Sequence, residues 1–305
     1  MKNSTLVISL DFELHWGVFD TYGERYNDNI LGARLAIPKI LSLFKKYNIH
    51  ATWAVVGFLF NEDKNDHAKY NPLLRPSYQD QRLNSYNCTF GTDESSDKLH
   101  YAHSIIKLIQ ECPNQELASH SYSHYYCQAK GQTIVEFDDD IKSAVIIAKD
   151  KFNVDLKSFG FPKNEVNYEY LEVLKKYSFS TYRDSSPAIF KRIFFDRIFR
   201  LMNTFLKLSK YSVNTVVEHQ GLKAIKGDRF LRPHTFSFLN YLMLRRIKNE
   251  MTFAAKNNSI YHLWWHPHNF GQNLDKNLDN LEIILKEYTA LQKKFNMRSV
   301  SMKDL

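Results

Sequence analysis

The sequence predicts an α/β protein in which parallel strands close into a barrel. Short apolar runs alternate with helical patterns along the 305 residues, as they do in proteins built on a mostly parallel sheet. The apolar runs are continuous, which is typical of strands that are covered on both faces. Seven such units fit a barrel better than an open sheet. We therefore expect one barrel domain over residues 1–305.

The predicted elements follow one another in a regular order. The strands are expected at residues 6–10, 51–57, 116–119, 158–161, 179–182 and 260–265, with a last one at 299–302. The helices are expected at residues 37–47, 99–111, 133–152, 168–177, 189–209, 239–256 and 278–295. Pro38 is tolerated because it falls in the first turn of its helix. Thr133 and Glu136 form a capping box that begins the helix at 133–152.

One segment interrupts this order after the second strand. Residues 61–97 are polar, rich in Tyr and Asn, and contain Pro72 and Pro76. A loop of this length inside a compact domain is usually functional or disordered. Because it lies between two strands whose ends should face the site, we favour an insertion that shapes a substrate site over a passive loop.

Net charge, cysteine content and the length of apolar runs limit which partners and which cellular compartment we expect for the protein. The net charge of +8 suits a phosphorylated substrate, a membrane surface or nucleic acid, but there is no clustered basic and aromatic motif of a nucleic-acid binder. The three cysteines lack metal-type spacing, and the apolar run at residues 6–10 is too short for a signal peptide. No apolar run approaches the roughly 20 residues of a membrane span. These features favour reduced thiols and the cytoplasm.

The first candidate site lies at the end of the first strand. If the strand remains extended there, Asp11 and Glu13 point the same way, because side chains alternate along a strand. Two acids at the end of an apolar strand are costly unless they are paired or bind a metal. The alternative is that both are solvated acids of a loop.

The second candidate site is the sequence Ser-His-Ser-Tyr-Ser-His at residues 119–124. The spacing of His120 and His124 fits one face of a helical turn. Two neutral imidazoles and one carboxylate, with a position left for water, are a common ligand set of a catalytic metal. The alternative is a pair of surface or hydrogen-bonded histidines.

Two further strands run into polar groups. Residues 261–270 carry an apolar strand into a His-Pro-His-Asn cluster, where His266 or His268 could act as a general acid or polarise a carbonyl. The alternative is a core Trp pair with satisfied histidines. Residues 159–167 end in polar groups that include Lys163, and the alternative there is an ordinary turn from strand to helix.

In combination these motifs resemble the polysaccharide deacetylase family, the NodB-homology enzymes of carbohydrate esterase family 4. The resemblance runs from residue 6 to about residue 302 and is strongest at residues 10–13, 51–57 and 119–124. Residues 263–271 are similar to a subgroup found in bacterial surface-glycan biosynthesis. The resemblance implies a distorted (β/α) barrel of seven or eight strands that hydrolyses an N-acetyl, or sometimes an O-acetyl, group on a sugar.

The resemblance also implies residue roles. Asp11 matches the base that deprotonates water, and Glu13 matches the metal-binding acid. His120 and His124 match the two metal histidines. His266 matches the general acid late in the chain, with His268 as the competing candidate.

Two departures from the family pattern affect these roles. The adjacent aspartates of the common first motif are here separated by Phe12, and the second acid is Glu13. The common third motif has Arg before Pro, whereas here Phe161 stands in that place. The cation that orients the base could then be Lys163, Arg183 or Arg232.

The leading interpretation is a metal-dependent deacetylase of an N-acetylated sugar in a surface-polysaccharide or lipid-linked precursor. Nitrogen and oxygen ligands with an open position suit Zn²⁺ first, with Co²⁺, Fe²⁺ or Ni²⁺ as alternatives. A deformylase or cyclic-amide hydrolase on the same scaffold is the nearest rival. An inactive glycan-binding or scaffold protein is the rival from another class. The oligomeric state is not predicted.

A second surface is predicted at Ile189 to Lys210. At 100° per residue its aromatic and aliphatic side chains share one face, and its basic side chains fall largely opposite. This is the pattern of a helix that rests on an anionic membrane surface. The alternative is a barrel helix or a subunit contact with its apolar face packed inside protein.

Overall fold

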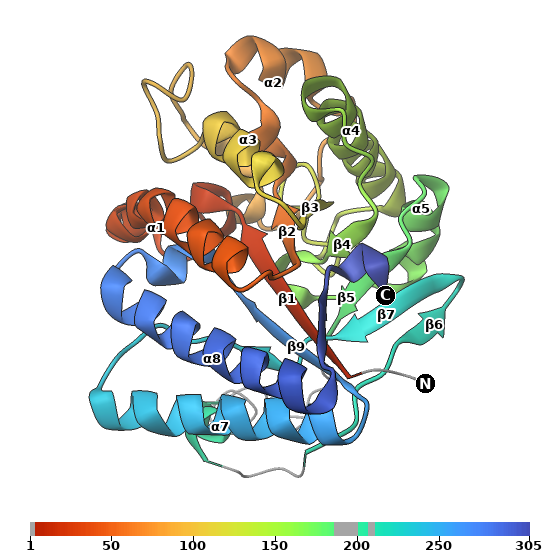
Figure 1. The fold of residues 1–305 in the computed structure, drawn as a ribbon. Coiled ribbons are helices and arrows are strands. Elements are labelled where there is room, and N and C mark those ends of the chain that lie inside the picture. The colour runs from red at the N-terminus through yellow and green to blue at the C-terminus, as the bar shows by residue number, and fades with distance from the viewer. Residues whose placement is uncertain (1–3, 186–200, 207–210) are drawn as a thin grey trace.

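The structure is a computed structural model that describes residues 4–185, 201–206 and 211–305. Its sheet contains β1 (Thr5–Phe12), β2 (Ala51–Val55), β3 (Gln115–Ser119), β4 (Ser158–Gly160), β5 (Thr181–Asp184), β6 (Val217–His219), β7 (Leu222–Lys226), β8 (Arg229–Phe230), β9 (Ile260–Trp265) and β10 (Arg298–Val300). Its longer helices are α1 (Asn27–Lys46), α2 (Lys64–Tyr70), α3 (His103–Glu111), α4 (Ile134–Phe152), α5 (Leu171–Lys176), α7 (Ser237–Lys256) and α8 (Leu274–Phe295). Helices α7, α8, α1 and α3 pack beside one another in that order, and α4 packs beside α5. All of them lie on the outer face of the curled sheet (Figure 1).

The strands form a distorted barrel. Their order is β6-β7-β5-β4-β3-β2-β1-β9-β8. Among these described strands, each pairing is parallel except the β6–β7 hairpin. Only Gly227 and Asp228 separate β7 from β8, so one segment pairs with β5 at its beginning and with β9 at its end. This segment brings the two ends of the sheet together. The predicted barrel class is confirmed.

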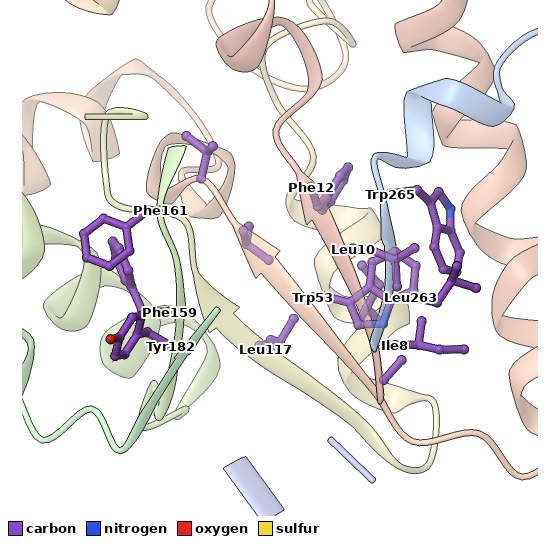
Figure 2. Packing of buried hydrophobic residues seen from close by; sticks show 14 of the residues in the cluster. Ile8, Leu10, Phe12, Trp53, Leu117, Phe159, Phe161, Tyr182, Leu263 and Trp265 are labelled. Atoms are coloured by element: carbon purple, nitrogen blue, oxygen red, sulfur yellow. The ribbon is translucent and has the colours of Figure 1, made fainter. Parts of the chain in front are cut away.

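The two faces of the strands differ. Ile8, Leu10 and Phe12 of β1 point away from the barrel axis into the main core, together with Trp53 of β2 and Trp265 of β9 (Figure 2). The alternate positions of β1 face the barrel interior, where Val7 packs in a small separate cluster. Ser9 and Asp11 continue this inner face and are buried. The interior therefore becomes polar towards the carboxyl ends of the strands, although continuous apolar runs had suggested apolar layers on both faces.

Several predicted boundaries are wrong. Helix α1 begins at Asn27 and not at residue 37, because its buried face extends back to Ile30. Pro38 consequently lies inside the helix. The strand predicted at 51–57 ends at Val55 and continues as a 3₁₀ turn, whereas β9 has the predicted bounds. The predicted capping box of Thr133 and Glu136 is present at the start of α4.

The polar insertion after β2 has a defined structure. It contains α2 and short 3₁₀ turns at Gln81–Leu83 and Ser85–Asn87. Asp63 caps α2 by accepting from two backbone N–H groups, and Asp97 accepts from the Gly91 N–H at 2.7 Å. Short polar side chains thus replace a regular hydrogen-bond ladder, which explains why residues 61–97 show no apolar period.

Among the described residues, no helix is long and apolar enough to cross a membrane. The helix predicted at Ile189 to Lys210 lies outside the described residues except for residues 201–206. In that short stretch Phe205 packs against the core, whereas Leu201 and Met202 are exposed.

Candidate active site

The strand register brings the candidate residues to one edge of the barrel. Leu10 of β1 lies beside Trp265 of β9, and Val55 of β2 lies beside Ser119 of β3. The residues that follow these strands include Glu13, His120 and His266. Parallel strands end at the same edge, which is where barrel enzymes place their chemistry.

Glu13, His120 and His124 form a cluster of three potential metal ligands. The three ligand atoms lie within 4.8 Å of one another, and all three side chains are buried. Glu13 Oε2 is 3.4 Å from His120 Nε2 and 3.2 Å from His124 Nε2. Ligand atoms about 2.1 Å from a tetrahedral ion lie about 3.4 Å from one another, so these distances fit a metal of that size.

The second nitrogen of each ring has a partner that fixes its orientation. His120 Nδ1 lies 2.8 Å from the Gly160 carbonyl oxygen, and His124 Nδ1 lies 3.1 Å from the Tyr126 hydroxyl. Burial lowers the pKa of His124, which favours the neutral ring that a metal needs. Such outer partners are typical of metal-binding histidines.

The electrostatics around Glu13 favour the carboxylate form. Burial by itself would raise the pKa of Glu13, but His266, His120 and His124 together hold it well below its ordinary value. Gly17 leaves the space that this side chain occupies, because a Cβ there would lie 1.9 Å from Glu13 Cδ. Charge and space therefore both suit an ionised ligand at this position.

The two histidines do not lie on a helical turn, which corrects the prediction. Residues 120–124 form a loop in which Ser121 and His124 have φ of 62° and 58°, in the left-handed region. The buried carboxylate of Asp140, on α4, accepts from the backbone N–H groups of Tyr122 at 2.7 Å and Ser123 at 3.0 Å. These two hydrogen bonds, which the loop donates to Asp140 on α4, hold the loop in its strained backbone conformation.

Asp11 is held by a buried arginine from β5. Arg183 Nη1 donates to Asp11 Oδ1 at 2.8 Å, and Nη2 donates to Oδ2 at 2.6 Å. Each side chain is only 2% exposed. Burial would raise the pKa of Asp11, but the Arg183 guanidinium, together with His120 and His266, lowers it below its ordinary value. This paired geometry fixes the plane of the carboxylate.

The other two candidate cations lie elsewhere. Lys163 pairs with Asp20 at 2.7 Å and lies 3.9 Å from the ring centre of Tyr126. Arg232 donates to the Thr204 hydroxyl at 3.3 Å. Of the three predicted candidates, the structure thus places Arg183 against Asp11 and not Lys163 or Arg232.

His266 lies between the two acids. Its Nε2 is 3.8 Å from Asp11 Oδ2 and 3.5 Å from Glu13 Oε1, and its side chain is 22% exposed. The buried ring of His268 stacks on it with a centroid distance of 4.8 Å. Burial lowers the pKa of His268 to about 3, which disfavours a proton there. His266 is the more accessible of the two rings.

A polar network beneath Asp11 was not predicted. Ser9 Oγ accepts from Arg183 Nη1 at 3.0 Å and lies 2.8 Å from His262 Nε2. The Arg183 guanidinium also stacks on Trp264, 4.6 Å from the ring centre. Ser9, His262 and Trp264 alternate with core residues on their strands, and that period of two is the signal that places them in the barrel interior.

Comparison with known proteins agrees with the resemblance seen in the sequence. The polysaccharide deacetylase family profile matches residues 26–182, which is more than half of the chain. The chain belongs to the polysaccharide deacetylase family. The match includes His120 and His124, whereas Asp11, Glu13 and His266 lie outside it. No match was found among curated proteins.

Two solved structures show the same fold. A Mycobacterium smegmatis protein assigned as a polysaccharide deacetylase is 11% identical, with a TM-score of 0.60, and the alignment covers 100% of this chain and 89% of that one. A Pseudomonas aeruginosa PAO1 protein with the same assignment is also 11% identical, with a TM-score of 0.58 and coverage of 98% and 88%.

Polysaccharide deacetylases are hydrolases of carbohydrate esters or amides that generally use a divalent metal. In this member of the family, Glu13, His120 and His124 form one set of residues that could hold such an ion. Their distances and burial fit such an ion.

Proposed function

We propose that this polysaccharide deacetylase removes the acetyl group from an N-acetylated sugar in a metal-dependent hydrolysis. The proposal rests on three kinds of side-chain group that lie together at one edge of the barrel. A Glu–His–His ligand set, a carboxylate paired with arginine and a partly exposed histidine lie within contact distance of one another.

The proposed chemistry needs an activated water. When bound, a divalent ion would lower the pKa of water from 15.7 towards roughly 7 and polarise the acetyl carbonyl. Asp11 then accepts the proton as the water oxygen bonds to the carbonyl carbon. Because Arg183 favours the ionised form of Asp11 and donates to both its oxygens, the carboxylate is unprotonated and held in one orientation.

The leaving amine needs a proton when the carbon–nitrogen bond breaks. His266 Nε2 faces the space next to both acids, and we propose that it supplies this proton. His266→Ala should then impair amide substrates more than esters with good leaving groups, which need less protonation. Equal losses on both substrates, or a larger amide-selective loss in His268→Ala, would move the role elsewhere.

The test of the function is product analysis on candidate precursor glycans. Acetate release that stops with a chelator and returns with Zn²⁺ is the expected result. Formate measured in parallel separates a deformylase on the same scaffold. If metal-loaded protein releases neither acetate nor formate from the candidate glycans, the proposed activity is contradicted.

We further propose that the substrate is a lipid-linked or surface-polysaccharide precursor in the cytoplasm. The free thiols of Cys88, Cys112 and Cys127 and the net charge of +8 support this setting. Contact of residues 189–210 with an anionic membrane remains part of the proposal. Co-sedimentation with anionic vesicles at low salt tests it, and protein that stays in the supernatant would contradict it.

A further inference from the structure

A second set of potential metal ligands shares Glu13 with the first. Glu13, His266 and His268 each offer one ligand atom, and these atoms also lie within 4.8 Å of one another. The Glu13 and His268 side chains are buried, and that of His266 is mostly buried. One glutamate thus has two imidazole pairs around it.

The two oxygens of Glu13 face different pairs. Oε2 is the atom near His120 and His124, whereas Oε1 is 3.5 Å from His266 Nε2 and 4.0 Å from His268 Nδ1. An ion bound at Oε2 therefore leaves Oε1 free to act as a ligand. Carboxylates bridge two ions about 3.5–4 Å apart in two-metal sites.

The second pair of rings is held in place before any ion binds. The rings of His266 and His268 are nearly parallel, with an interplanar angle of 7°. Tyr26 packs edge-on against His268 at 5.2 Å, and Phe230 packs on His266 at 5.6 Å. Both rings are therefore packed next to Glu13 before an ion binds.

We propose that Glu13, His266 and His268 form a second, weaker divalent-metal site whose occupancy inhibits the enzyme. Imidazole and carboxylate ligands suit Zn²⁺. The site should be weaker because one of its ligand distances is longer and because two ions on one carboxylate repel each other. The inhibition rests on the proposed function, since a nitrogen whose lone pair is bound to a metal cannot carry the proton for the leaving amine.

Metal stoichiometry tests the site without reference to activity. Metal-free protein is dialysed against increasing Zn²⁺ and its metal content is measured. The wild type should bind two equivalents, the second more weakly. His268→Ala should keep the first equivalent, which also shows that it is folded. It should bind the second at least about 100-fold more weakly, because loss of a direct ligand should cost no less than the 10–100-fold loss of an outer partner. His50→Ala, at the opposite end of the sheet, is the control and should behave as the wild type.

His266→Ala removes the other imidazole of the set and should show the same selective loss. A wild type that binds only one equivalent overturns the proposal, as does either variant if it keeps both equivalents at wild-type affinity.

The activity arm tests the inhibition. Acetate release by the wild type should fall when Zn²⁺ exceeds one equivalent, whereas the residual activity of His268→Ala should not depend on that excess. Wild-type activity that stays constant as the second equivalent binds overturns the inhibitory role. A protein that binds two equivalents but never releases acetate would contradict the proposed function and leave the second site standing.

Discussion

Asp11 on β1 and Glu116 on β3 are both buried carboxyl groups, but their environments shift their pKa values in opposite directions. Asp11 is held by the Arg183 guanidinium, so its pKa is lowered despite burial. Glu116 accepts from the Thr52 hydroxyl at 2.7 Å and from the Lys303 backbone N–H at 3.2 Å, and burial raises its pKa. The partner of a buried acid, and not its burial, decides whether it stays ionised.

The two acids, Asp11 and Glu116, also lie at opposite ends of their strands. Asp11 lies near the carboxyl end of its strand, at the edge with the candidate ligands, whereas Glu116 lies near the beginning of β3. The Glu116 carboxyl joins β2, β3 and the C-terminal segment through neutral donors. At the carboxyl edge of the barrel the buried acid favours the charged form and lies in the candidate site. At the other edge the buried acid connects neighbouring elements through hydrogen bonds.

Removal of the arginine should have the largest effect on stability. Arg183→Met leaves Asp11 buried without its cation, and breaking a buried pair in this way costs about 3–5 kcal/mol. Urea unfolding at pH 7 measures the loss. Arg82→Met, which removes an exposed pair with Asp80, is the control and should change little. A cost for Arg183→Met as small as that of the control would show that the pair does not hold Asp11.

Removal of the Asp140 carboxylate, which holds the loop of His120 and His124, should have an intermediate effect on stability. Burial raises the pKa of Asp140 to about 6, yet its carboxyl accepts two backbone N–H groups of the loop. Asp140→Ala leaves these donors unsatisfied, at a cost of about 1–3 kcal/mol, and should weaken Zn²⁺ binding by Glu13, His120 and His124. Asp138→Ala, which removes a partly exposed α4 carboxylate paired with Lys176 at 2.7 Å, is the control. Unchanged metal affinity in Asp140→Ala would show that Asp140 does not position the loop for metal binding.

The smallest effect is expected at Glu116. Because its folded pKa is raised, its protonated form stabilises the fold below the unfolded pKa, and that contribution is lost as pH rises through the folded value. Glu116→Gln imitates the protonated form, so it should cost less than about 1 kcal/mol at pH 4 and become relatively more favourable towards pH 8. Unfolding experiments across this range measure the difference. A difference that is constant with pH would contradict the raised pKa.

The fold class and the motif residues could be predicted because they depend on local patterns. Alternating apolar runs and helical periods indicated the barrel, and β9 has its predicted bounds. The closing segment was missed because Lys226, Gly227 and Asp228 interrupt its apolar run. Gly227 leaves room for Trp264, since a Cβ at this position would lie only 3.0 Å from that side chain.

The partners within the site could not be predicted to the same degree. Asp11 and Arg183 are 172 residues apart in sequence, and only the strand order brings them together. The strand period places Ser9 and His262 in the barrel interior, but it does not show that they contact each other or that Ser9 contacts Arg183. The spacing of His120 and His124 suggested a helix, but the same separation of rings arises from a loop with two left-handed residues.

The central claim is that Asp11 transfers protons whereas Glu13, His120 and His124 hold the metal. Metal content and acetate release measured on the same preparations of Asp11→Asn and of the His120→Ala, His124→Ala double variant test this division. Asp11→Asn should bind Zn²⁺ as the wild type does but turn over at least about 100-fold more slowly, whereas the double variant should lose both metal and activity. Retained turnover in Asp11→Asn, loss of its metal together with its activity, or wild-type metal content in the double variant would contradict it.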